Sequence, residues 1–92
     1  MKYQIQHGVV LQNVCDEYLL IATGEARAVC PSARQINSGA AYYWKLLQSG
    51  MTEEEMLDAA AAEYEVPVET LRPGLIKFLE RLSLDHYLIP QT

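Results

Sequence analysis

The side chains that most often carry chemistry are few in this sequence, and their spacing does not bring them together. Two cysteines, Cys15 and Cys30, and two histidines, His7 and His86, are the candidate metal ligands. A structural zinc site needs four ligands at short spacings, commonly with a Cys-x-x-Cys pair, and no such pair is present. We therefore expect no metal site and no disulfide, and we expect both thiols to be ordinary half-buried side chains.

The nucleophilic and acidic residues do not indicate a catalytic centre either. A cysteine paired with His86 would supply a nucleophile and a base, but no local signature or oxyanion-type glycine motif accompanies one. Asp16 and Glu17 are adjacent acids, yet neighbours on a turn diverge and normally stay in water. The glycines form no phosphate-binding pattern. These observations predict that the protein is not an enzyme and uses no cofactor.

One aromatic group, Tyr42-Tyr43-Trp44, remains as a candidate ligand site. Aromatic residues at helical spacing fill a core more often than they line a cofactor pocket. We therefore predict that Tyr43 and Trp44 belong to the core and that Tyr42 faces outward.

The composition describes one small acidic domain that covers residues 1–92. Half of the residues are hydrophobic and 21% are charged, which suits a single packed globule. The net charge of -5 weighs against binding to nucleic acid or anionic lipid. Polar residues interrupt the apolar stretch from Val9 to Ala22, so we expect neither a membrane span nor a secretion signal and predict a cytoplasmic protein.

The first part of the chain predicts a small antiparallel sheet. Two runs rich in strand-favouring residues, Val9–Val14 and Tyr18–Thr23, flank the acidic turn Cys15-Asp16-Glu17 and indicate a hairpin. A looser connection, Gly24–Pro31, then leads to a third short strand over Ser32–Ile36.

From Asn37 onward the pattern becomes helical. Asn37 or Ser38 caps a first helix that stops at Ser49-Gly50. A capping box, Thr52-Glu53-Glu54-Glu55, begins the second helix, and Pro67 ends it.

The third helix contains Pro73, which decides where we expect it to begin. Proline is tolerated in the first turn of a helix, so we place the start at Arg72 or Pro73 and treat residues 68–71 as a lead-in turn. The apolar segment at 85–89 closes the chain as a docking segment or a short strand. The predicted fold class is α+β, with a three-stranded antiparallel sheet followed by three helices.

A sheet of three short strands leaves two edges with unpaired backbone N–H and C=O groups. Where such an edge runs beside a helix, an extended peptide can add itself as a further strand. Main-chain hydrogen bonds then supply affinity, and alternate side chains that enter pockets on the helix side supply selectivity. Because this mode of binding needs no catalytic residue, the sequence favours a peptide-binding protein.

Several short segments also match one protein family in order and spacing. The most specific is the block from Ile36 to Gly50, where an Asn, a Trp, a Leu-Leu pair and a Gly recur at the family's spacing. Over about residues 9–89 the chain resembles the PqqD-like proteins. The other segments are Val14-x-x-Glu17-Tyr18-Leu19-Leu20-Ile21, Thr52-x-x-Glu55, Glu63-Tyr64-Glu65-Val66 and Phe78-Leu79-Glu80-Arg81-Leu82.

The resemblance implies a winged helix-turn-helix domain that acts as a peptide chaperone. Such proteins bind the leader of a ribosomally made precursor peptide by strand addition and present it to a modifying enzyme, commonly a radical SAM protein. The resemblance places the binding edge at Ser32, Ala33, Arg34, Gln35, Ile36 and Asn37, and the facing helix positions at Gly74, Lys77, Phe78, Arg81 and Leu82.

This chain departs from the family's pattern at two places. Arg34 stands where relatives usually have an apolar residue, so its head either reaches the rim or pairs with an acid, which could belong to the leader. The Arg72-Pro73-Gly74 segment replaces an ordinary helical turn. With Lys77 and Arg81, Arg34 is expected to form a basic spot on an otherwise acidic molecule.

Two other functions fit the same predicted elements. A winged helix-turn-helix also describes a DNA-binding transcriptional regulator, but the third helix has Glu80 beside Lys77 and Arg81, and the second helix is acidic. An unprotected edge also invites self-pairing, so the choice between monomer and homodimer stays open, as does a scaffold without a peptide client. The sequence does not name the precursor or the enzyme partner.

Overall fold

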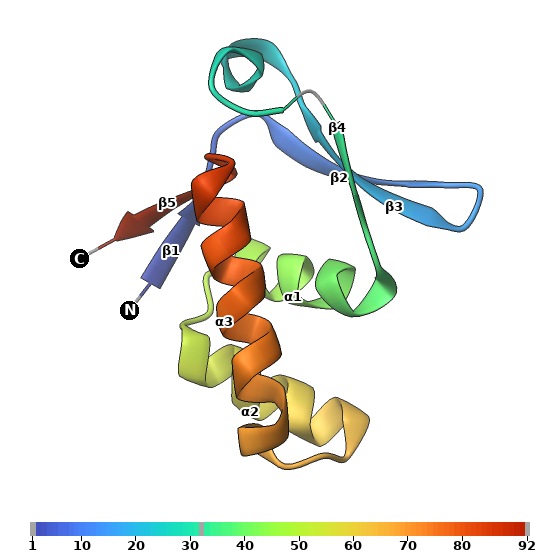
Figure 1. Ribbon diagram of the computed structural model, residues 1–92, viewed down its shortest axis with the longest axis vertical. Helices are drawn as coiled ribbons and strands as arrows, with labels where there is room; N and C mark the ends of the chain where they lie inside the picture. Colours follow the sequence, from blue (N-terminus) through green and yellow to red (C-terminus); the bar gives the residue numbers. More distant parts are fainter. Residues whose placement is uncertain (1, 32, 92) are drawn as a thin grey trace.

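The computed structural model describes residues 2–31 and 33–91, and Figure 1 shows their arrangement. All three α-helices lie on one side of a three-stranded sheet. In chain order the elements are β1 (Lys2–Ile5), β2 (Val9–Val14), β3 (Glu17–Ala22), a 3-10 helix η1 (Gly24–Ala28), β4 (Ala33–Ile36), α1 (Ser38–Gln48), α2 (Glu53–Tyr64), α3 (Val68–Leu84) and β5 (Leu88–Gln91).

The three-stranded sheet is antiparallel, with the order β2-β3-β4. The prediction of an α+β fold with this sheet followed by three helices is confirmed. The hairpin turn consists of Cys15 and Asp16, which both have positive φ (51° and 65°), as the twist of a two-residue hairpin requires. Glu17, which we expected in the turn, is the first residue of β3.

A second sheet, which the sequence analysis did not predict as such, joins the two ends of the chain. β1 pairs with β5 in antiparallel fashion, and Figure 1 shows the two termini side by side. The closing segment is therefore a strand, one of the two alternatives left open for it. β1 was not predicted, because it has only four residues and its pairing partner lies at the other end of the chain.

Gly8 fixes the path between the two sheets. The backbone N–H and the hydroxyl of Thr23 both donate to the Gly8 carbonyl oxygen, at 2.9 and 2.6 Å. Gly8 has a φ of +95°, and a Cβ at this position would lie 2.5 Å from the Thr23 carbonyl oxygen. Only glycine fits this turn without a shift of the backbone.

The core lies between the inner face of the sheet and the helices. Trp44 of α1 is fully buried, as predicted, and Tyr43 is partly buried against the same core. Tyr42, which we expected to face outward, is only half-exposed, because its hydroxyl donates to the Ala59 carbonyl oxygen at 3.3 Å. The largest fully buried side chains are Trp44, Tyr87, Leu20, Met56, Leu57, Leu75, Leu79 and Leu82.

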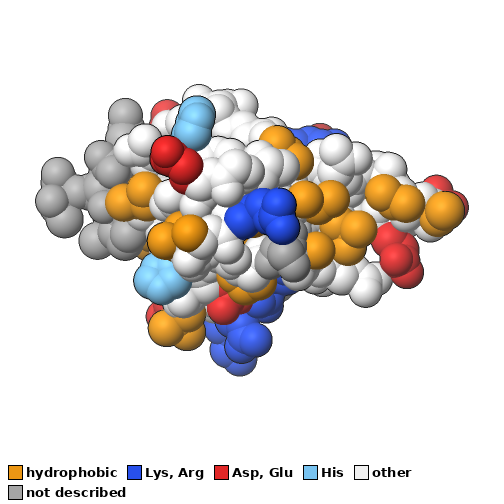
Figure 2. Space-filling model, turned by 90° about the horizontal axis from the view of Figure 1, so that it is seen from above, with side chains coloured by type: hydrophobic (Ala, Val, Ile, Leu, Met, Phe, Trp, Pro, Cys, Tyr) orange, Lys and Arg blue, Asp and Glu red, His pale blue; other side chains and the backbone are white. Residues whose placement is uncertain are grey.

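The outer face of the same sheet carries apolar side chains that no helix covers. Val10 and Val14 of β2 are 39% and 47% exposed, and Val10 stands opposite Ile21 of β3. Figure 2, which views the molecule from above, shows hydrophobic side chains along the half that ends in the β2–β3 hairpin.

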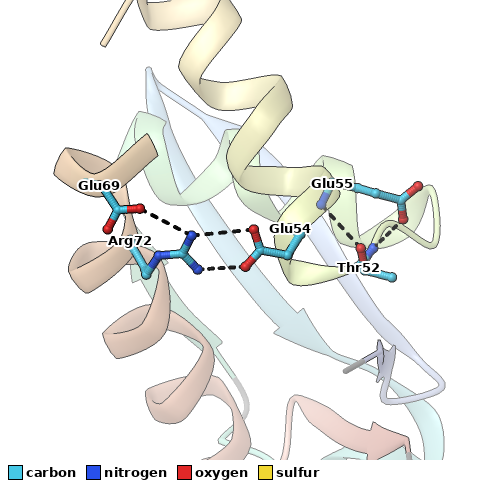
Figure 3. Close-up of polar contacts among 5 residues, drawn as sticks. All are labelled: Thr52, Glu54, Glu55, Glu69 and Arg72. Carbon is cyan, nitrogen blue, oxygen red and sulfur yellow. Dashed lines mark hydrogen bonds and ion pairs between the residues drawn. The ribbon is translucent and has the colours of Figure 1, made fainter. Parts of the chain in front are cut away.

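The first two helices begin with the caps that the sequence predicts. The Asn37 side chain accepts a hydrogen bond from the Ala40 amide at 2.7 Å. At the start of α2, Thr52 and Glu55 form the reciprocal capping box that Figure 3 shows. Both caps satisfy amides that a first helical turn leaves without partners.

The start of α3 differs from the prediction. The helix begins at Val68 rather than at Arg72 or Pro73, so Pro73 lies inside it and removes one backbone donor. The additional first turn is held by packing of Val68 and Leu71 against the core. It is also held by Arg72, whose guanidinium bonds Glu54 of α2 at 2.6 and 3.4 Å and lies 3.6 Å from Glu69 (Figure 3). These contacts offset the lost hydrogen bond.

Candidate functional site

The β4 strand has an outer edge that stays unfilled in the described part of the chain. β4 pairs with β3 on one side only, and β1 and β5 pair with each other. Alternate residues of a strand direct their N–H and C=O groups to opposite sides, so half of these groups on β4 point away from β3. This edge is a template for one more strand.

The side chains of β4 divide between the two faces of the sheet. Arg34 stands opposite the buried Leu20, and Ile36 stands opposite Tyr18, so both point to the helix side. Ala33 and Gln35 are exposed on the outer face. Ile36 is only 9% exposed and belongs to the core, so it supports the edge from within.

Hydrogen bonds tie the segment that enters β4 to the end of α3. The Tyr87 hydroxyl donates to the Pro31 carbonyl oxygen at 3.0 Å, and the Cys30 thiol donates to the His86 carbonyl oxygen at 3.1 Å. Burial, and secondarily the Asp85 carboxylate, raises the pKa of Cys30, so this thiol is neutral and structural. Cys30 is buried and Cys15 exposed, whereas we expected both to be half-buried; neither forms a disulfide.

Asp85 at the end of α3 joins the two arginines that we expected in a basic spot. Its carboxylate accepts a hydrogen bond from Arg34 of β4 and lies 3.7 Å from Nε of Arg81. Arg34 therefore pairs with an acid, and that acid belongs to its own chain. Among the described residues Lys77 has no ion pair, and its side chain is exposed.

A pocket of about 480 Å³ lies beyond the carboxyl end of β4, between the start of α1 and the first half of α3. None of its lining residues is charged. A Cβ placed on Gly74 would meet no atom within 4 Å, so α3 is open to the pocket at this point. The lining residues are Asn37, Ser38, Gly39, Ala40, Tyr43, Tyr64, Thr70, Leu71, Gly74 and Phe78.

Aromatic rings form much of the pocket wall. The ring centroids of Tyr43 and Phe78 lie 6.2 Å apart, and those of Tyr42 and Tyr64 lie 5.4 Å apart in an edge-to-face arrangement. Burial, and then the neighbouring Tyr64 and Tyr42, raises the pKa of Tyr43, which is therefore an uncharged phenol at neutral pH. Such a wall suits a large apolar side chain.

The predicted site residues fall into distinct places. Asn37, Gly74 and Phe78 line the pocket, and Arg34 and Arg81 meet at Asp85. Leu82 differs from its predicted role: it is fully buried, so its side chain offers no surface to a ligand. Ser32 lies outside the described residues.

Several pocket residues were missed by the sequence analysis, for physical reasons. Thr70 and Leu71 were missed because the third helix was expected to start after them. Tyr64 was missed as a pocket residue; it is 48% exposed at the end of α2. Its spacing from Tyr42 gives no local signal, since the two rings meet only when α1 and α2 pack.

Residues 31–88 match the family described as coenzyme PQQ synthesis protein D (PqqD). The chain belongs to the PqqD family. The matched residues begin just before β4 and end at the start of β5. The PqqD region therefore includes the unfilled edge, the pocket and the ionic cluster formed by Arg34, Arg81 and Asp85.

A solved structure supports the same fold over nearly the whole chain. It is described as TbiB1 in complex with the TbiA(beta) leader peptide, and it is similar to this PqqD-family chain with 27% sequence identity and a TM-score of 0.78. The similarity covers 97% of this chain and 98% of that one. No match was found among the curated proteins.

Two further observations concern residues 2–31 and 33–91. No helix in this part of the chain combines the length and the apolar character needed to cross a membrane. Nor does this part contain three His, Cys, Asp or Glu residues grouped so that they could hold a metal ion.

Proposed function

We propose that this protein is a non-catalytic cytoplasmic chaperone that binds the leader of a ribosomally made precursor peptide. The observation that carries the proposal is the unpaired edge of β4 beside an uncharged aromatic pocket. Membership of the PqqD family and the similarity to TbiB1, a protein described with a leader peptide, support it.

In the proposed complex the leader adds itself to β4 as a fourth strand. Its main chain bonds the outward N–H and C=O groups of residues 33–36, and every second side chain turns toward α3. One large apolar side chain enters the pocket formed by Tyr43, Leu71 and Phe78. The main-chain bonds provide affinity for an extended segment, and the pocket selects which segment binds.

The chemical modification belongs to a separate enzyme in this proposal. The candidate nucleophiles of this chain are structural or isolated: Cys30 is buried in a hydrogen bond, and Cys15 is exposed at the hairpin turn. We propose that a maturation enzyme, a radical SAM protein as the family resemblance implies, receives the leader from this chaperone.

Fluorescence anisotropy tests the binding step. The probe is a fluorescein-labelled leader from the precursor gene that neighbours this protein's gene, and a scrambled leader of equal composition is the control. We expect a Kd of about 1 μM or below for the leader, equivalent to roughly 8 kcal/mol, and no saturable binding for the scrambled peptide. Equal binding of both peptides, or of neither, would refute the proposal.

Backbone methylation tests whether the binding uses strand addition. N-methyl groups placed one at a time along the leader should abolish binding at alternate positions, because only every second amide of an added strand faces β4. A leader that tolerates methylation at every position would bind by side chains alone.

A further inference from the structure

We propose that Arg81 and Lys77 select an acidic residue of the leader and thereby set the direction in which the peptide lies along β4. This inference rests on the proposed leader binding and deepens it. It makes the ligand a segment with a large apolar side chain at one end and a carboxylate at the other.

The exposed side of α3 is uncharged in its first half and ionic toward its end. Gly74, Phe78, Arg81 and Asp85 follow one another at spacings of three or four, so they form one stripe. The first two residues line the uncharged pocket, and the last two belong to the ionic cluster at the amino end of β4. A peptide beside β4 therefore meets an apolar end and a basic end.

Arg81 rather than Arg34 is the group available to a ligand. The Arg34 side chain is only 28% exposed, and Asp85 accepts its hydrogen bond. The Arg81 side chain is 63% exposed, and the contact between its Nε and Asp85 is long at 3.7 Å. The two arginines share one carboxylate, so the cluster keeps a net positive charge, and a second carboxylate would balance it.

Lys77 adds to the same positive end. It precedes Arg81 by one helical turn, and among the described residues it has no ion pair. Glu80 adjoins Arg81 in sequence, but among the described residues no ion pair joins it to Arg81 or to Lys77. Its charge also acts on Tyr3 of β1, where it helps to raise the pKa of the phenol after the larger effects of burial and Glu53. On a chain with a net charge of -5, this basic pair is a local exception.

The dimensions predict the spacing of the two leader residues. Arg81 follows Gly74 by seven positions along the helix, which is roughly 10 Å, or about three to four residues of a strand. Because side chains on one face of a strand recur every second residue, the two leader residues stand about four positions apart. Antiparallel pairing is the more stable arrangement and is the one used throughout this sheet, so the apolar residue precedes the acid.

A charge swap tests the acid-selecting pair. The labelled leader is compared with derivatives in which each Asp or Glu is changed to Asn or Gln, and then to Lys. We expect one such position to weaken binding about tenfold, Arg81→Glu to weaken binding of the unmodified leader at least as much, and the leader with Lys at that position to recover affinity for Arg81→Glu. Arg27→Glu, an equal change of charge on the exposed η1 segment, controls for long-range electrostatics.

The outcomes separate this inference from the function on which it rests. Tight binding that is insensitive to every acid replacement, or equal effects of Arg81→Glu and Arg27→Glu, would overturn the inference alone. Absence of binding by the unmodified leader would overturn the proposed function and this inference together. A diazirine analogue of leucine in place of Leu71, nearly the size of the native side chain and in the pocket lining, completes the test. Attachment on the amino-terminal side of the critical acid is expected, and attachment on its carboxyl-terminal side would overturn the assigned direction.

Discussion

The two edges of the three-stranded sheet differ in their surroundings rather than in their backbones. In the described part of the chain, β2 and β4 each pair with β3 on one side only, so each has one edge that no further strand covers. β4 runs into the start of α1, where the pocket opens, and its amino end is bonded to the end of α3. β2 leads instead to the hairpin turn, with Val10 and Val14 exposed beside it. An edge becomes a selective site only where a helix supplies pockets for the side chains of the added strand.

The outer edge of β5, where no ligand is expected, is less suited to pairing with a further strand. β5 contains Pro90, which has no backbone N–H and so weakens any further pairing along that strand. β4, with the sequence Ala-Arg-Gln-Ile, contains no proline and keeps all its donors. The contrast between β4 and β5 fits a template that is kept open for use.

The largest expected effect comes from filling the pocket beside β4. Gly74→Trp introduces a ring where a Cβ meets no neighbour within 4 Å, so the fold should tolerate it while the ring occupies the pocket. Anisotropy with the labelled leader should show a loss of affinity of about a hundredfold, as expected when a well-packed anchor is excluded.

Gly74→Ala is the matched control for this substitution. It changes the helix propensity in the same direction but leaves the pocket open, so it should bind normally and be slightly more stable. If Gly74→Trp also binds normally, the pocket does not take part in recognition and β4 has no advantage over β2.

Hydrogen exchange compares the two edges directly. Addition of the leader should slow exchange of the outward amides of β4 by about tenfold or more, because they become bonded to the peptide, and should leave the amides of β2 unchanged. Mass spectrometry or NMR would measure this effect. Protection at β2 with none at β4 would assign the peptide to the opposite edge.

A smaller effect is expected at the cluster that ties β4 to α3. Asp85→Asn leaves Arg34 half-buried without a counter-charge and should lower the free energy of unfolding by about 1 kcal/mol. Urea denaturation measures the loss. If Arg34→Gln in the same background causes no further loss, the two residues act as a pair; additive losses would show that they act separately.

The smallest effect concerns the first turn of α3, which lines the far side of the pocket. The hydrogen bond that Arg72 donates lowers the pKa of Glu54, and the positive charge of Arg72 lowers it further. The pKa of Glu54 is lower in the folded than in the unfolded protein. The ion pair therefore contributes fully to the free energy of unfolding above the unfolded-state pKa, about 4.5, and this contribution is lost as the pH falls through the folded-state pKa. The pair is exposed, so Glu54→Gln should lower the melting temperature only slightly at pH 7, and by progressively less as the pH falls below about 4.5. An equal drop at every pH would show that charge is not the cause.

Elements whose signals are local can be predicted from the sequence alone. The hairpin, the Asn37 cap, the capping box at Thr52 and the burial of Trp44 all follow from the types and spacing of neighbouring residues, and the structure confirms them. The family resemblance also predicted the β4 edge and the exposed side of α3 as the binding region, because its motifs lie in the same segments.

Contacts between distant segments depend on tertiary packing and could not be predicted. The pairing of β1 with β5, the extra turn of α3 before Pro73 and the contact of Arg34 with Asp85 each join residues that are far apart in sequence or depend on packing that outweighs a local preference. The pocket belongs to this class as well. Its walls come from three helices, and a cavity exists only once their relative positions are set by burial of the shared core.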